Sequence, residues 1–176
     1  MYTRVKYCNN CEDPVEALPY MVALAPRHYS IPYEVTAELV YGVPNFGEGK
    51  KLLNKVEVEN RIVFLDRGGG VSIVEKAFKA QAQGAVGVIV ADNGQCDSDF
   101  NYCGRQAGSK REGGFGAYDE LVDWRAIRIP VLMVNSESAE RLRARMPIEQ
   151  KNIGRLGMQN VTVLPQPPKP THFDEF

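Results

Sequence analysis

The segment Arg61–Lys76, RIVFLDRGGGVSIVEK, constrains the fold most, because an apolar run, three glycines and a helical pattern follow one another directly. The apolar run Arg61–Arg67 predicts a buried strand. Gly68, Gly69 and Gly70 predict a sharp turn, because glycine adopts positive φ angles without steric cost. The order strand, glycine loop, helix also occurs where proteins bind phosphate groups. The segment therefore predicts either a structural turn or a nucleotide site.

A helix is expected to begin just after Ser72. Ser72 and Glu75 have the spacing of a capping box, in which each side chain accepts a hydrogen bond from the other residue's backbone amide. The predicted buried stripe of this helix holds Ile73, Ala77, Phe78 and Gln81. Gly84 predicts the end of the helix. The apolar run Ala85–Asp92 predicts a second strand, which completes a β–α–β unit.

Only part of a dinucleotide-binding fingerprint is present. Gly68 and Gly70 occupy the first two glycine positions, but Ile73 stands where the third glycine is required. Asp92 lies where an acid that binds ribose would lie, and no Gly-Lys-Ser/Thr sequence follows the turn. These features favour a structural role for the turn and no cofactor, with a nucleotide or small-molecule binder as the alternative.

The rest of the chain predicts further strands, a second helix and two proline-rich ends. Strands are expected at 20–25, 33–42, 127–135 and 159–165, and a helix capped by Ser136 over 137–146. The predicted organisation is an extended lead-in over 1–34, one domain over 35–165 with a long loop at 93–126, and a proline-rich tail over 166–176.

Charge and composition exclude several classes of function. The 176 residues carry a net charge of −1, which argues against nucleic-acid binding. The apolar runs are shorter than the ~20 residues of a membrane span, so direct membrane contact is not expected. No signal peptide is visible, which favours an intracellular location. The alternative is a secreted chain whose leader has been removed, in which the sequon at Asn160 would be an acceptor for N-glycosylation.

The four cysteines form two local pairs, Cys8 with Cys11 and Cys96 with Cys103. Six residues separate the second pair, more than the usual two to four between zinc ligands, so a shared zinc site is disfavoured. Two local disulfides and reduced thiols both remain open.

No constellation of catalytic residues is apparent. The only histidines are His28 and His172, and the chain lacks both a His-Glu-x-x-His motif and a Gly-x-Ser-x-Gly elbow. The segment 97–101 begins like a calcium loop but continues without the required glycine and closing glutamate. The sequence therefore predicts a protein that is not an enzyme and that has no resident metal.

The stretch IVFLDRGGGVSIVEKAFKAQAQGAVGVIVADN, followed after a gap by IPVLMVN, resembles the protease-associated (PA) domain over roughly residues 35 to 147. That family typically shows Arg-Gly after a strand, a helical Lys, a Gly-Ala junction, a strand that ends near Asn, and a later Ile-Pro. The matching residues here are Arg67-Gly68, Lys76, Gly84-Ala85, Asn93 and Ile129-Pro130. Gly70 and Val71 stand where many members have a cysteine, so the family's disulfide habits are not carried over.

The resemblance implies an α/β (α+β) fold with an open β-barrel or sandwich core and flanking helices. It also implies a non-catalytic module that docks protein partners or acts as a lid. The long loop and the tail are the expected binding segments, because loops on a rigid scaffold commonly carry binding residues. The candidate contacts in the loop are Lys110, Arg111, Phe115, Tyr118 and Trp124. A structural subunit of a large intracellular assembly, with this fold as its scaffold, is a further alternative.

Overall fold

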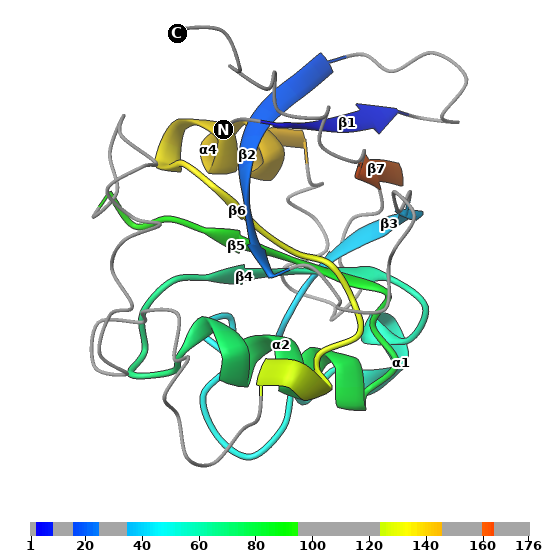
Figure 1. The fold of residues 1–176 in the computed structure, drawn as a ribbon, viewed down its shortest axis with the longest axis vertical. Helices are drawn as coiled ribbons and strands as arrows, with labels where there is room; N and C mark the ends of the chain where they lie inside the picture. The colour runs from blue at the N-terminus through cyan, green and yellow to red at the C-terminus, as the bar shows by residue number, and fades with distance from the viewer. Residues whose placement is uncertain (1–2, 9–15, 25–34, 95–123, 146–159, 164–176) are drawn as a thin grey trace, which may run out of the picture.

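The computed structural model describes residues 3–8, 16–24, 35–94, 124–145 and 160–163 (Figure 1). Its centre is a parallel sheet formed by β3 (Val35–Tyr41), β4 (Ile62–Asp66), β5 (Gly87–Ala91) and β6 (Val131–Val134). In this sheet β4 pairs with β3 and β5, and β5 pairs with β6. The carboxyl ends of β4, β5 and β6 therefore lie along one edge of the sheet.

Helices lie on both sides of these parallel strands. The helical elements are α1 (Lys55–Val58), α2 (Ile73–Ala82), the 3-10 helix η2 (Trp124–Ala126) and α4 (Ser136–Arg145). Figure 1 shows α2 below the strands and α4 above them. The helix α2 connects β4 to β5 and forms the predicted β–α–β unit.

Three further strands pair in antiparallel fashion: β1 (Thr3–Cys8), β2 (Glu16–Leu24) and β7 (Asn160–Val163). β2 pairs with β6, while β1 pairs with β2 and β7, and β7 also pairs with β3. The sequence predicts only one short strand in the lead-in, at 20–25, and the structure corrects this to two strands, β1 and the longer β2. The partner strands β6 and β7 lie more than 100 positions away along the chain, so local sequence gives little sign of the pairing.

The predicted mixed α/β class is confirmed by the four parallel strands and the helices beside them. The finer description, an open barrel or sandwich, depends on how β1, β2 and β7 pack. Their side chains lie outside the described part of the chain, and that description stays a prediction.

The core lies around the parallel strands. Phe64, Ile89 and Leu132 are at most 1% exposed and come from three adjacent strands. Every residue of β5 and β6 is buried, which is typical of parallel strands covered on both faces. Buried residues of α2 and of α4 belong to the same core cluster. A single core therefore holds the sheet edge and both helices in fixed relative positions.

The helix ends agree with the sequence in one case and differ in another. Ser72 Oγ accepts a hydrogen bond from the Glu75 amide at 3.1 Å, and α2 begins at the next residue, Ile73. The predicted cap of α4, Ser136, is wrong by one residue. Asn135 Oδ1 accepts from the Ser138 amide at 2.8 Å, and Ser136 is already helical. Asparagine and serine cap helices about equally well, so the sequence alone did not separate them.

The buried face of α2 also differs from the predicted stripe. Ile73 and Ala77 are buried as expected, but Phe78 is 41% exposed. The face instead includes Val74 and Ala80, which lie closer to the sheet-facing direction of the helix. The exposed ring of Phe78 thus remains available on the outer surface.

Candidate functional site

A cleft of about 280 Å³ lies at the carboxyl ends of β4, β5 and β6. Its wall is formed by residues that end or follow these strands, by the loop after β3 and by one face of α4. The lining residues are Phe46, Asp66, Arg67, Ala91, Asp92, Asn93, Ser136, Glu140 and Arg143. This edge of a parallel sheet is where α/β proteins commonly bind ligands, because the loops that follow the strands converge there.

A buried ion pair connects the residues that follow β4 and β5 in the wall of the cleft. Arg67 Nη1 donates to Asp92 Oδ1 at 3.0 Å, and the two side chains are 2% and 0% exposed. Asp92 Oδ2 also accepts from the Gly94 amide at 2.9 Å. A buried pair of this kind is strongly destabilising to break, because removal of one partner leaves an uncompensated charge. The pair therefore holds the ends of the two strands, and the start of the long loop, in one arrangement.

A second, partly exposed network joins α4 to β4. Arg143 forms ion pairs with Asp66 and with Glu140, and Asp66 also accepts a hydrogen bond from Asn45. The Arg143 guanidinium lies 5.5 Å from the centre of the Phe64 ring, within the range of a cation–π contact. These contacts fix α4 against the end of β4 at the cleft.

The glycine turn lies beside the loop that carries Phe46. The φ angles of Gly68, Gly69 and Gly70 are 116°, 68° and 65°, a region that L side chains rarely adopt. A Cβ added at Gly69 would lie 2.5 Å from the Phe46 Cβ. The turn therefore requires glycine at this position both for its backbone conformation and for the close approach of the Phe46 loop.

Lys76 connects the turn, the Phe46 loop and α2. Its side chain is completely buried, and its Nζ donates to the Gly68 carbonyl at 3.0 Å and to the Phe46 carbonyl. Burial lowers the pKa of the Lys76 ammonium to about 8. Because the ammonium donates hydrogen bonds to two backbone carbonyls, Lys76 stabilises the packing of the turn and the Phe46 loop on α2.

The rim of the cleft carries groups suited to contact with a protein. Phe46 is 40% exposed, and Asn93 is exposed at the point where the predicted long loop begins. The Glu140 side chain is 71% exposed. Aromatic residues are enriched in protein interfaces, so the exposed ring of Phe46 is the group on this rim best suited to such contact.

The predicted contact residues Lys110, Arg111, Phe115 and Tyr118 lie outside the described residues. Trp124 begins η2, but its side chain is outside them too. The same holds for Cys11, Cys96, Cys103 and the tail, and for the side chain of Cys8, which ends β1. The predictions for these residues, including the two possible disulfides, stay predictions.

Sequence reasoning missed Phe46, Asp66 and Arg143 as members of one site. A usable signal was present for Asp66, because it ends an apolar strand of the β–α–β unit, as Asp92 follows another. Phe46 and Arg143 come from a loop and a helix far away along the chain, and only the fold brings them to this edge.

Within the described ranges, no group of three or more His, Cys, Asp or Glu side chains is placed to hold a metal ion. None of the helices in the described part of the chain has the length and apolar character needed to cross a membrane.

Comparisons with known proteins identify the fold. The model of the PA domain family matches residues 35–142, and no curated protein matches the chain. Similar solved structures include the zinc aminopeptidase BSAP from Bacillus subtilis, at 17% identity and a TM-score of 0.50 over 92% of this chain and 29% of that one. A medium-resolution structure of BSAP shows 16% identity and a TM-score of 0.51, over 97% and 35% of the two chains.

An aminopeptidase from Aneurinibacillus sp. strain AM-1 is also similar, with 21% identity and a TM-score of 0.46 over 94% of this chain and 31% of the other. The present chain thus spans about a third of the length of each of these structures.

Proposed function

Because this chain belongs to the PA domain family, as its match over residues 35–142 establishes, we propose that it is a non-catalytic module that docks a protein partner at the cleft. The observation that carries the proposal is that the charged side chains lining the cleft form ion pairs with one another. Arg67 is paired with Asp92, and Arg143 is paired with Asp66 and Glu140. These pairs give the charged groups structural tasks and leave the aromatic ring of Phe46 at the rim as an anchor.

The buried pair also supports a role other than catalysis. A general base must reach a substrate proton, directly or through one water molecule. Asp92 is 0% exposed at its side chain and already accepts hydrogen bonds from Arg67 and Gly94. Its position favours a rigid support for the rim over proton transfer.

The proposal treats the similar aminopeptidases as guides to the fold. This chain spans only about a third of the length of each aminopeptidase. We therefore propose that it docks a partner and does not itself hydrolyse peptides. A direct check is to incubate the purified chain with an amino-acid p-nitroanilide, with and without added Zn²⁺. We expect no release above the protein-free rate. A saturable, zinc-dependent rate would contradict the non-catalytic role.

Docking is tested by affinity capture from the source cells with two matched variants. Phe46→Ser removes the exposed ring at the cleft, whereas Leu53→Ser removes an apolar side chain that is 74% exposed and does not line the cleft. We expect Phe46→Ser to lose the captured partner and Leu53→Ser to retain it. Because Phe46 also packs on the glycine turn, Asn93→Arg serves as a second variant that blocks the rim from an exposed position.

The outcome is read together with the melting temperature of each variant. Loss of capture by both rim variants, with melting temperatures close to that of the wild type, supports docking at the cleft. Equal capture by the wild type, Phe46→Ser and Asn93→Arg would show that the partner binds elsewhere.

A further inference from the structure

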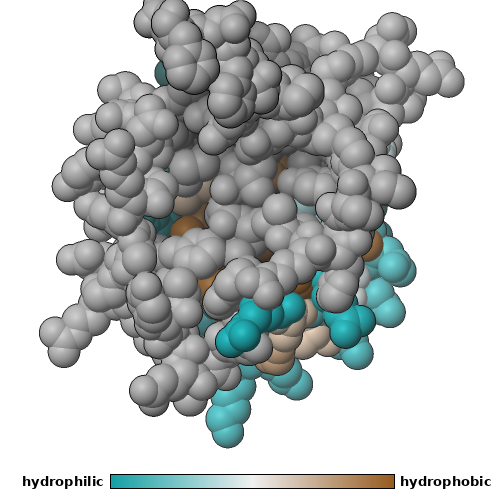
Figure 2. Space-filling view, viewed as in Figure 1, coloured by the Kyte–Doolittle hydropathy of each residue, from teal (hydrophilic) through white to brown (hydrophobic). Residues whose placement is uncertain are grey.

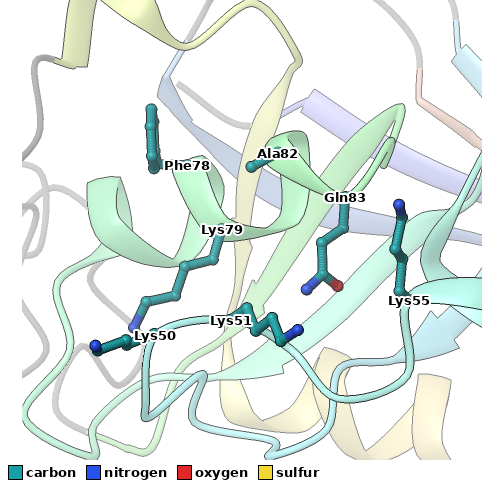
Figure 3. Close-up of a pocket in the computed structure, with 7 residues that line it drawn as sticks. All are labelled: Lys50, Lys51, Lys55, Phe78, Lys79, Ala82 and Gln83. Atoms are coloured by element: carbon teal, nitrogen blue, oxygen red, sulfur yellow. The ribbon is translucent and has the colours of Figure 1, made fainter.

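A second surface, separate from the cleft, gathers positive charge beside α2. A pocket of about 320 Å³ is lined by four lysines, together with Phe78, Ala82 and Gln83. The lysines are Lys50, Lys51, Lys55 and Lys79. Figure 3 shows the Lys79 side chain directed from α2 toward the loop that carries Lys50 and Lys51. In Figure 2, hydrophilic side chains occupy the lower edge of the molecule, the side on which α2 lies in Figure 1.

Most of this charge is not neutralised within the described part of the chain. Lys79 forms an ion pair with Glu75 at 2.8 Å, which balances one of the four charges. Lys50, Lys51 and Lys55 are exposed, and none of them has an ion-pair partner among the described residues. A concave surface with three uncompensated cations attracts a group that carries several negative charges.

The pocket is held in place by buried polar contacts. Lys79 Nζ donates to the Gly47 carbonyl at 2.7 Å, and Gln83 Nε2 donates to the Leu52 carbonyl at 2.7 Å. Lys79 lies in the last turn of α2 and Gln83 is its C-cap residue, whereas both acceptors belong to the loop that carries Lys50 and Lys51. Lys50 and Lys51 therefore project from a loop that is fixed at two points, which lowers the entropy lost when a ligand binds.

Two further features distinguish a peptide from a simple anion. Phe78 is 41% exposed and lines the pocket together with the lysines, where it offers a ring to an apolar side chain, although it points away from the loop of Lys50 and Lys51 (Figure 3). Gln83 is 7% exposed, and its Oε1 is a buried acceptor without a hydrogen-bond partner among the described residues. Phosphate supplies mainly acceptors, whereas a peptide supplies carboxylates, apolar side chains and N–H donors together.

From these observations we propose that the lysine pocket binds an acidic segment of a partner protein, with several carboxylates flanking an aromatic side chain. The carboxylates contact Lys50, Lys51 and Lys55, and the aromatic side chain packs on Phe78. The surface is lined by α2, the loop after β3 and the first residue of α1, and it shares no lining residue with the cleft at the strand ends.

The test uses a fluorescent peptide with two glutamates on each side of a phenylalanine, and a neutral version in which glutamines replace the glutamates. Fluorescence anisotropy should show saturable binding of the acidic peptide and none of the neutral one. Raising NaCl from about 50 mM to about 500 mM should weaken binding, because salt screens exposed charges.

Matched variants separate the pocket from the general charge of the protein. Lys51→Glu should weaken peptide binding by about tenfold or more, since it replaces an attraction with a repulsion. Arg141→Glu changes the net charge equally, but it lies on α4, on the other side of the strands, and should leave binding within about twofold of the wild type. Phe78→Ala should weaken binding of the acidic peptide with no change in its salt dependence.

Three outcomes would overturn the proposal. One is equal binding of the acidic and neutral peptides, and another is an equal effect of Lys51→Glu and Arg141→Glu. The third is that the acidic peptide does not bind, whereas inorganic phosphate or vesicles containing phosphatidylserine do bind and lose binding in Lys51→Glu. The cleft variant Asn93→Arg should leave peptide binding unchanged, which keeps this test independent of docking at the cleft.

Discussion

Arg67 Nη1 lies 3.0 Å from Asp92 Oδ1, and this ion pair joins the carboxyl ends of two neighbouring parallel strands in a fully buried setting. The two residues are 25 positions apart in the sequence. Their contact holds the ends of β4 and β5 together in the wall of the cleft. The predicted long loop begins at Asn93, directly after Asp92. The shape of the proposed docking surface therefore depends on this pair.

A double-mutant cycle should show that the two charges depend on each other. Arg67→Met or Asp92→Leu alone leaves a buried charge without its partner and should lower the free energy of unfolding by about 3–5 kcal/mol. The double variant replaces both charges with apolar groups and should be more stable than either single variant. Urea denaturation of the four proteins measures these differences. A double variant that loses the sum of the two single losses would show that the pair is not coupled.

Lys76 should make stability depend on alkaline pH. Burial lowers the pKa of its ammonium from 10.5 to about 8 in the folded protein. Between these two values the unfolded chain binds more protons than the folded chain, so the contribution of Lys76 to stability rises with pH. Below pH 8 both states are protonated, and the cost of the buried charge is fully present.

The predicted signature is a difference between the wild type and Lys76→Met. Their difference in free energy of unfolding should shift in favour of the wild type by up to about 3 kcal/mol from pH 7.5 to 10.5. Gln83→Met is a suitable control, because it also removes a buried hydrogen bond to a loop carbonyl but no titratable group. A wild type and a Lys76→Met variant that keep a constant difference across this range would contradict the prediction.

The glycine turn offers a comparison between neighbouring positions. Gly69 and Gly70 both have positive φ, so alanine at either should cost about 1–2 kcal/mol in backbone strain. Gly69→Ala also brings a Cβ to 2.5 Å from the Phe46 Cβ, whereas a Cβ at Gly70 meets nothing within 4 Å. Thermal denaturation should therefore show a clearly larger loss for Gly69→Ala. Equal losses would mean that the Phe46 loop moves aside at little cost.

The contacts of the turn support the prediction that it binds no nucleotide. Ser72 already accepts from the Glu75 amide at the start of α2, and Lys76 is engaged with the Gly68 and Phe46 carbonyls. Titration calorimetry with ATP, NAD and FAD should give no saturable binding with a Kd below about 100 μM. Tighter binding that is lost in Gly70→Ala would instead support the small-molecule alternative.

The sequence predicts the parallel part of the fold well, because its signals there are local. The apolar run of β4, the capping serine of α2 and Gly84, which has a φ of 88° after the helix, are all neighbours of one another along the chain. The resemblance to the PA family spans this same part and is confirmed by the match over 35–142. Burial on both faces then follows from continuous apolar strands.

The site was harder to predict, because its contacts are long-range. Arg143 lies 77 positions from Asp66, and Lys76 lies 30 positions from Phe46, so neither contact leaves a pattern in the local sequence. The helical position of Phe78 predicts a core residue, yet Phe78 lies at the edge of the buried face and is exposed. The exposure of a side chain at such an edge depends on the local packing and does not follow from helical periodicity.

Docking of a partner at the cleft is tested most directly by site-specific photo-crosslinking in the source cells. A photoreactive residue at position 93 lies on the cleft rim, and one at position 53 is exposed but lies outside the cleft. Mass spectrometry should identify a defined protein adduct at position 93, absent at position 53 and lost when Phe46→Ser is added. Equal adducts at both positions, or an adduct only at position 53, would contradict docking at the cleft.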